Sequence, residues 1–583
     1  MLVYVKFRLQ RQLRRFRRDI RLWRIYITNY FERHIWGKWR QLGTIRRFIL
    51  VWWSIMVVSF IGLALQIGTL KQAYLKAGPQ DGGIYSEGLV GTVKSINPIL
   101  PDSDASSDVS RLIFSSLMRL NADGQIEGDL AQSWQVSADG RTYSFHLQPG
   151  AKWQDGAPLT AKDVLFTLKL IQNPDTRSPL ASSWQGVSAQ AVNDSTINFI
   201  LPNPFAPFIY SVNFGILPKH LLEGVDPATL RVTAFNQQPV GSGPFKFVSL
   251  SPDGKNVALS PNPTYYRGAP LLDQFNFHLY NDQQLLRQAY AKHQVNAIGR
   301  VSASELTGYG QATIHAMTML DEVGLFMRTT TTNLGDKAVR QAIIQSINRT
   351  KLASAMKDDV AESVSLPILP GQLGYNAKYS VPQFDPKSAA KTLDAAGWVL
   401  GKNAQRRKDN KPLTFKLVTA NVGNYPLVAG QIRDNLAKVG ITVNLELVDV
   451  NQLQQTYIRP RNYDLLLYTV AIGPDPDGYA YWQSSQANDP GLNLSQYSSA
   501  SADKALEAAR LTSDSAIRTA RYGNFLSAWT ADLPADMLYI PNYLYLTNRN
   551  VSGVVARRIG DPTDRFYGVE RWTINTRQSL RTS

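Results

Sequence analysis

Few side chains in this sequence have the spacing that catalysis or metal binding requires. The chain has no cysteine, which excludes disulfides, thiolate nucleophiles and Cys-ligated metal sites. Its six histidines are scattered, without the spacing that holds a metal ion. Asp155 and Asp163 resemble a catalytic carboxylate pair, but each suits a local role, as a turn residue and as a helix cap. We therefore expect no enzymatic activity, no cofactor and no metal.

The stretch from Tyr463 to Trp482 is the best candidate for binding chemistry. An apolar run stops abruptly at the turn sequence GPDPDG, residues 473–478. A run without polar alternation is typical of a strand covered on both faces of an α/β sheet, and ligands bind beyond the carboxyl ends of such strands. The pattern predicts a binding cleft at this junction.

The elements that must position this junction form a β-α-β-α-β pattern. Its two crossover connections predict that the three strands are parallel. The carboxyl end of the last strand is then Ala471–Gly473, where the cleft is expected. The elements are predicted at residues 413–419, 428–439, 441–447, 451–458 and 465–472.

Other helices and strands are predicted from helix-capping residues and from the alternation of apolar and polar residues. Thr160 and Asp163 fit a capping box at the start of a helix, and Asp336 and Asp385 fit caps of two more. The apolar and polar alternation of residues 141–147 predicts a half-exposed strand. An opening strand is predicted within residues 88–98, closed by Asn-Pro.

The charge of the chain indicates a basic tail, residues 1–47, and a nearly neutral body that follows it. At 583 residues it is too long for one core, and several lobes are expected. Residues 1–47 carry fourteen Lys and Arg against two acidic residues, so they hold +12 of the total +17. The rest of the chain is nearly balanced, and a nucleic-acid partner is not expected.

The basic tail has the periodicity of an amphipathic helix. Apolar residues recur every three or four positions through residues 2–30, with arginines between them. Such a helix binds an anionic membrane surface, so we expect residues 1–47 to contact membrane lipids. Packing against a partner helix and nucleic-acid binding are the alternatives.

A membrane-spanning segment follows the tail. Residues 48–65 have no charge, and apolar character continues to about residue 70. Arg46 and Arg47 precede this segment, which predicts a cytoplasmic N-terminus and an extracellular or periplasmic body at the cell membrane. A cleaved signal peptide is the alternative, although the 47 residues before the segment favour a retained single-pass anchor. Residues 71–83 are predicted to be a linker.

Seven ordered segments of the body resemble the extracellular solute-binding proteins of the oligopeptide/dipeptide class, the capture subunits of ABC importers (bacterial solute-binding family 5). The resemblance covers about residues 89–572. The segments are LQPGAKWQDGAPLTAKDVLFTLK, PVGSGPFKF, NPTYYRGAPLLDQFNFHLYND, DKAVRQAIIQSINRTKL, FDPKSAAKTLDAAGW, QIRDNLAKVGITVNLELV and YDLLLYTVAIGPDPDGYAYW.

The resemblance implies an α/β, two-lobed, periplasmic-binding-protein-like clamp of type II with an extra subdomain. The amino-terminal lobe is expected at residues 84–325, completed by about 535–583, and the carboxyl-terminal lobe at 326–534. The basic amphipathic helix (1–47) and the transmembrane helix (48–70) precede them.

The resemblance also implies the ligand site, in which the protein main chain hydrogen-bonds the ligand. Many peptide-binding relatives place an Asp where this chain has Ile472, which puts capture of free amino termini in doubt; Asp475 could substitute, or could cap the turn. Trp482 is expected as an apolar wall. The expected main-chain partners are Thr92, Val93, Lys94, Ser95, Thr469, Val470, Ala471, Ile472 and Gly473.

The implied function is capture of peptides or similar small solutes for an ABC transporter permease. The alternative is a membrane-tethered sensor, chaperone or scaffold with the same fold and no role in transport. Neighbouring permease and ATPase genes would favour import.

Overall fold

The structure is a computed structural model that describes residues 26, 28–30, 46–309 and 312–580. The chain divides into two units, residues 1–78 with 577–583, and residues 79–576. The amphipathic helix predicted within residues 1–47 lies almost entirely outside the described residues.

Helix α2 (Arg46–Tyr74) contains the predicted membrane segment. The side chains of residues 47–66 are all exposed. Within the described part of the chain, α2 is the one helix whose length and composition would allow it to cross a membrane. Residues 71–83 are not simply a linker, because they contain the end of α2 and strand β1 (Leu75–Gln80), which pairs with β24 (Asn575–Leu580).

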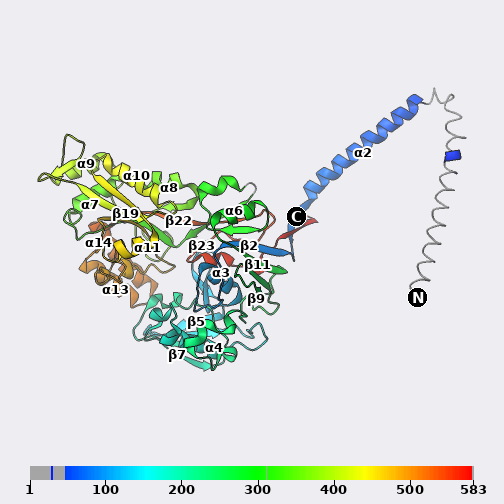
Figure 1. The fold of residues 1–583 in the computed structure, drawn as a ribbon, viewed down its shortest axis with the longest axis horizontal. Helices are drawn as coiled ribbons and strands as arrows, with labels where there is room; N and C mark the ends of the chain where they lie inside the picture. Colours follow the sequence, from blue (N-terminus) through cyan, green and yellow to red (C-terminus); the bar gives the residue numbers. More distant parts are fainter. Residues whose placement is uncertain (1–25, 27, 31–45, 310–311, 581–583) are drawn as a thin grey trace. The chain divides into compact units, whose positions relative to one another are not determined.

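A mixed sheet runs through the second unit, and its strands are ordered β20-β19-β21-β14-β22-β12-β2-β11-β10-β9. Strands β13, β15 and β23 join it at β22 and β13. Figure 1 shows β19 on the side of α7, α9 and α10, and β2, β11 and β9 on the side of α3. The strands are β2 (Ile84–Val90), β9 (Phe245–Leu250), β10 (Asn256–Pro261), β11 (Gln274–Tyr280), β12 (Ala297–Gly299), β13 (Thr313–Met319), β14 (Asp321–Met327), β15 (Val360–Ser363), β19 (Thr414–Ala420), β20 (Thr442–Val448), β21 (Leu465–Ala471), β22 (Ala535–Thr547) and β23 (Arg558–Ile559).

Helices cover this sheet, and smaller sheets extend from it. The helices are α3 (Asp104–Ile113), α4 (Ala161–Gln172), α5 (Lys219–Leu222), α6 (Gln283–Ala291), α7 (Lys337–Ser346), α8 (Arg349–Met356), α9 (Pro386–Ala395), α10 (Tyr425–Ala437), α11 (Val450–Gln452), α12 (Tyr479–Trp482), α13 (Ala500–Arg510) and α14 (Ser515–Asp532). The smaller sheets are formed by β3 (Met118–Leu120) and β4 (Ile126–Gly128), by β5 (Ala131–Val136), β6 (Thr142–Leu147), β7 (Ser188–Asn193) and β8 (Thr196–Ile200), and by β16 (Val399–Leu400), β17 (Arg406–Lys408) and β18 (Lys411–Pro412).

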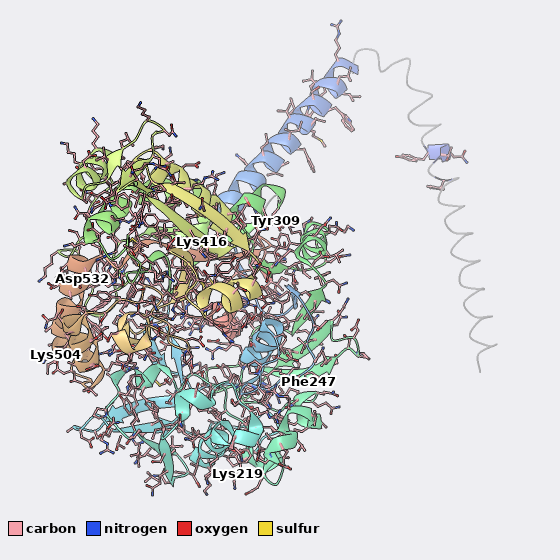
Figure 2. The ribbon with its side chains drawn as sticks, turned by 60° about the vertical axis from the view of Figure 1, so that its left-hand side comes forward. Lys219, Phe247, Tyr309, Lys416, Lys504 and Asp532 are labelled. Atoms are coloured by element: carbon pink, nitrogen blue, oxygen red, sulfur yellow. The ribbon has the colours of Figure 1, made fainter. Side chains whose placement is uncertain are left out.

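Two large hydrophobic cores define an N-terminal and a C-terminal lobe. The N-terminal core consists of residues from Tyr85 to Met317 and from Tyr543 to Ile574, and so includes Tyr543 and Tyr545 of β22. The C-terminal core consists mainly of residues 320–540. In Figure 2, Phe247 lies in the N-terminal lobe and Lys416, Lys504 and Asp532 lie in the C-terminal lobe. Strand β22 therefore contributes to both cores.

The predicted β-α-β-α-β unit is present in the C-terminal lobe. Strand β19 is parallel to both β20 and β21, as the two crossovers require. Helix α10 connects β19 to β20 and is followed by Gly440, whose φ of +84° suits a glycine after a helix end. Helix α11 and the following helical turn, Leu453–Ile458, lead to β21.

The cap prediction at Thr160 and Asp163 is confirmed. The Asp163 carboxylate accepts the Thr160 N–H at 2.8 Å, in a capping box that starts α4. The other Asp163 oxygen accepts the Lys219 N–H at 2.9 Å. Asp155 accepts the Ala157 N–H in a turn and contacts His220 Nε2 at 2.7 Å. Both carboxylates therefore have structural roles.

The strand predicted within residues 88–98 lies earlier in the sequence in the structure. Strand β2 covers Ile84–Val90 and runs parallel to β11 and β12. The chain leaves the sheet at Gly91, whose φ of +117° is accessible mainly to glycine. Residues 92–95 consequently lie in a loop.

A buried ion triad fixes the N-terminal lobe. Arg565 is fully buried and bonds Glu87 Oε1 on β2 at 2.6 Å and Asp108 Oδ1 on α3 at 2.6 Å. The Tyr545 hydroxyl of β22 donates to the other Glu87 oxygen at 2.6 Å. Burial raises the pKa of Glu87, although Arg565 opposes this shift. Four segments that are distant in sequence are thus joined by charge-assisted bonds.

We expect Arg565→Met to destabilise the N-terminal lobe strongly. Removing one partner leaves two buried carboxylates without a counter-charge, at a cost of about 3–5 kcal/mol. The measurement is the denaturation midpoint at pH 7.5, with Arg571→Met as the control because the Arg571 side chain is 79% exposed. Equal midpoints for the two variants would contradict the structural role of the triad.

Candidate functional site

Both lobes line a cavity of about 290 Å³. From the N-terminal lobe come Arg111 on α3, Arg119 on β3, and Tyr210 and Asn213. Gly473 and Pro474, which follow β21, come from the C-terminal lobe. The cavity therefore lies at the strand-to-turn junction where the sequence predicts a cleft. The remaining lining residues are Leu120, Ile126, Gly560, Asp561, Thr563 and Asp564.

The crossover between the lobes forms one end of this site. Leu320 connects β13 to β14, and its N–H donates to the Ile559 carbonyl at 2.8 Å. Its own carbonyl accepts the Gly473 N–H at 2.9 Å. The cavity is thus built where the chain passes from one lobe to the other.

The main chain of residues 469–473 makes several bonds within the protein. Thr469, Val470 and Ala471 pair with β14. The Tyr481 hydroxyl donates to the Ala471 carbonyl at 2.6 Å. The Gly473 N–H is used by Leu320, and the Gly473 carbonyl accepts from Gln372 Nε2 at 2.7 Å. On its other edge β21 pairs with β19 at Leu465 and Leu466, short of residues 469–471, so the bonds to β14 occupy one edge of this main chain.

The residues around Ile472 and Asp475 have structural partners. Ile472 is partly buried and packs against the C-terminal core. Both carboxylate oxygens of Asp475 accept from Arg518 Nη2, at 2.6 and 2.9 Å, so this carboxylate already has a counter-charge within the protein. Both side chains are nearly buried, and Tyr522 completes the cluster by accepting from Arg518.

Three of the four predicted residues of the N-terminal lobe line a different cavity. Thr92, Val93 and Lys94 border a space of about 980 Å³ next to the β9–β10 hairpin. The Val93 N–H donates to the Gly254 carbonyl at 2.9 Å, and the Thr92 carbonyl accepts from Ser103. The Ser95 hydroxyl is buried. Residues 92–94 and Gly473 therefore border two different cavities.

The prediction that Trp482 forms an apolar wall of the cleft is wrong. The side chain is fully buried in the C-terminal core. It stacks on Phe326 with ring centroids 5.8 Å apart and meets the Trp529 ring edge-on at 5.5 Å. The apolar surface of the Trp482 ring therefore stabilises the core of the C-terminal lobe.

A second cavity between the lobes, of about 500 Å³, is bordered by an arginine sandwich. The guanidinium of Arg510 on α13 lies 4.7 Å from the ring of Phe205 in the N-terminal lobe. It also lies 4.1 Å from the ring of Tyr479 and pairs with Asp477 at 2.9 Å. This cation–π contact holds the lobes together beside the cleft.

Asp321, at the start of β14, is a charged group near the cleft that the sequence did not indicate. It lies directly across the ladder from Ala471. Burial raises its pKa to about 6, and the nearby Asp561 carboxylate contributes to the shift. The ionised form of Asp321 is therefore costly at neutral pH.

Sequence reasoning also missed Arg111, Arg119, Tyr210 and Asn213. Arg111 stands within an amphipathic helix, and Arg119 within a short strand. Neither belongs to a motif that distinguishes a cleft arginine from an ordinary surface arginine. Only the family resemblance could have directed attention to them, by placing the cleft between the lobes.

We expect the stability of the protein to fall with rising pH, in part through Asp321. The folded pKa of about 6 lies above the ordinary value of 3.8, so this contribution is present below pH 4 and is lost as the pH rises through 6. Asp321→Asn should be more stable than wild type by about 1–2 kcal/mol at pH 7.5 and equal to it at pH 4.

The measurement for Asp321→Asn is the denaturant midpoint at both pH values. The matched control is Asp358→Asn, at an exposed position of the same lobe. A difference from wild type that does not change with pH would contradict this account of Asp321.

Known proteins match this chain along most of its length. Residues 125–491 match the bacterial extracellular solute-binding proteins, family 5. The oligopeptide-binding protein AppA of Bacillus subtilis is 28% identical over 543 residues, which cover 90% of this chain and 99% of AppA.

Solved structures share the fold. AppA from Bacillus subtilis in complex with a nonapeptide has a TM-score of 0.66 and 27% identity, over 85% of this chain and all of that one. NikZ from Campylobacter jejuni in complex with Ni(L-His) has a TM-score of 0.68 and 25% identity, over 84% of this chain and 99% of that one. The α/β, two-lobed fold is therefore that of a periplasmic binding protein.

The family match spans well over half of the chain, and the fold and the interlobe cavity agree with it. This chain belongs to family 5 of the bacterial extracellular solute-binding proteins.

Proposed function

We propose that this chain captures a peptide or similar small solute between its two lobes and delivers it to an ABC importer. The observation that carries the proposal is the 290 Å³ cavity, which side chains of the N-terminal lobe and the Gly473–Pro474 turn line together. A site divided between two lobes favours closure around the solute. Relatives named for oligopeptide binding, and the nonapeptide in AppA, support a peptide, whereas Ni(L-His) in NikZ supports a wider range of solutes.

We further propose that the lobes are residues 84–325, completed by 535–583, and residues 326–534. The cores divide within a few residues of these boundaries, near Leu320 and between Ile540 and Tyr543, so residues 320–325 and 535–540 pack in the C-terminal core. Hinge motion would then occur at the β13–β14 junction and in the middle of β22.

Solute binding is tested with the full chain in detergent and a panel of peptides, sugars and amino-acid complexes, read out by native mass spectrometry. We expect retained mass or a raised melting temperature for at least one class. Asn213→Trp places a bulky ring at the exposed rim of the cavity and should abolish this binding.

The matched control for Asn213→Trp is Asn403→Trp, in an exposed loop of the C-terminal lobe. Binding that survives Asn213→Trp would place the solute elsewhere. Failure of the whole panel with folded wild-type protein would contradict the proposal itself.

We also propose that α2 is a retained anchor, with residues 1–47 on cytoplasmic lipids and the body outside. The uncharged, exposed surface of residues 48–65 and the preceding Arg46 and Arg47 support this orientation. Protease added to intact cells should remove the body, and its membrane form should keep the mass of the full chain. A fully protected body would contradict the orientation, and a shortened chain would indicate a cleaved signal.

A further inference from the structure

Arg510, the last residue of α13, contacts both lobes. Its guanidinium carbon lies 4.7 Å from the ring centroid of Phe205 in the N-terminal lobe and 4.1 Å from that of Tyr479 in its own lobe. Its Nε lies 2.9 Å from Asp477 Oδ2, and the Arg510 side chain is 28% exposed. The ion pair of Arg510 therefore lies within the C-terminal lobe, whereas its contact with Phe205 crosses from one lobe to the other.

The turn that follows β21 connects Arg510 to the interlobe cavity. Pro474 of this turn lines the cavity, and Asp477 of the same turn pairs with Arg510 on α13. Between them, Asp475 pairs with Arg518 on α14 at 2.6 Å. The cavity lining and Arg510 are thus connected through a turn that ion pairs hold at two points.

On the N-terminal side, one helical turn connects Phe205 to the same cavity. This turn covers Ala206–Tyr210, directly after Phe205, and Tyr210 lines the cavity. The Phe205 carbonyl accepts from the Tyr143 hydroxyl at 3.1 Å, which holds the start of the turn. Burial raises the pKa of Tyr210, and the Asp475 carboxylate of the other lobe adds to the shift. Both ends of this helical turn therefore lie close to the C-terminal lobe.

We propose that Arg510 is a positioning residue for closure, whose contact with Phe205 forms when the lobes close over a solute and breaks when they open. The inference rests on the proposed function and concerns how long the solute stays bound. Rotation at the proposed hinges moves Phe205 relative to Arg510 but leaves Asp477 and Tyr479 beside it, because these two residues belong to the same lobe as Arg510.

The energetics of the Arg510–Phe205 contact suit a reversible closure. When the lobes open, Arg510 keeps Asp477 as its counter-charge, so opening does not leave a buried charge unpaired. What is lost is a cation–π contact of a partly exposed arginine, which changes the ratio of closed to open protein by about 2- to 5-fold. A contact of this size prolongs solute binding and still permits release.

The test compares the wild-type full chain in detergent with Phe205→Leu, which keeps an apolar side chain and removes the ring. Spin labels at Ala228→Cys and Lys504→Cys, both exposed and in different lobes, report the interlobe distance. The probe is a library of random tripeptides at one sub-saturating concentration, whose retention is measured by native mass spectrometry. We expect Phe205→Leu to lower both the ratio of shorter to longer distances and the retained tripeptide by about 2- to 5-fold.

Three further variants separate this role from general damage. Phe384→Leu removes a ring that is 43% exposed in the C-terminal lobe and should change neither readout. Arg510→Lys keeps the positive charge and should retain part of the preference for the shorter distance. In an Arg510→Met background, Phe205→Leu should have no further effect, because the contact is already lost. Misfolding of Arg510→Met would not remove the test, since Phe205→Leu is read out directly.

Equal distance distributions and equal retention in wild type and folded Phe205→Leu would overturn the role of Arg510 while leaving solute capture intact. Additive losses in the double variant would also overturn it. If wild type retains no tripeptide, the distance distributions alone decide, and no shift in Phe205→Leu contradicts the proposal. The proposed function falls as well only if the wider panel of solutes is not bound.

Discussion

Strand β22 belongs to both hydrophobic cores, and the arrangement of the two lobes depends on it. Its first half pairs with β14, and its second half pairs with β13 and β12. Pro541, between these halves, has no N–H to give to a ladder. The chain also passes between lobes at Leu320, next to Gly473 and Ile559. The interlobe cavity is therefore located where the covalent connections concentrate, so a small rotation there would open or close it.

Charged side chains in the buried cores and charged side chains near the interlobe cavity differ in how closely they are paired. Arginines compensate two of the buried carboxylates, Arg565 for Glu87 and Arg518 for Asp475. Near the cleft the compensation is weaker, because Arg111 pairs at long distance and the pKa of Asp321 is raised. Imperfectly paired charges are costly in an empty site and favourable when a ligand of opposite charge arrives.

The β-α-β-α-β unit of the C-terminal lobe could be predicted from the sequence because local patterns determine its helices and strands. Alternation in β19 and β20, the stop at Gly440 and the cap at Asp385 are all local signals. Apart from Gly473, the residues that line the interlobe cavity could not be predicted in this way. The positions of Arg111 and of Thr92 relative to Gly473 depend on how the lobes dock, and Trp482 is buried by α13 and α14 packing from later in the chain. Contacts that are distant in sequence leave no periodic pattern.

Closure of the two lobes on a solute is tested most directly by measuring the distance between the lobes. Because the chain has no cysteine, Ala228→Cys in the N-terminal lobe and Lys438→Cys in the C-terminal lobe, both exposed, can carry one spin label each. Pulsed electron–electron distance measurements on the full chain should show a shorter, narrower distribution when the solute found in the panel is added at saturation. A distribution unchanged by saturating solute would contradict closure of the lobes around the ligand.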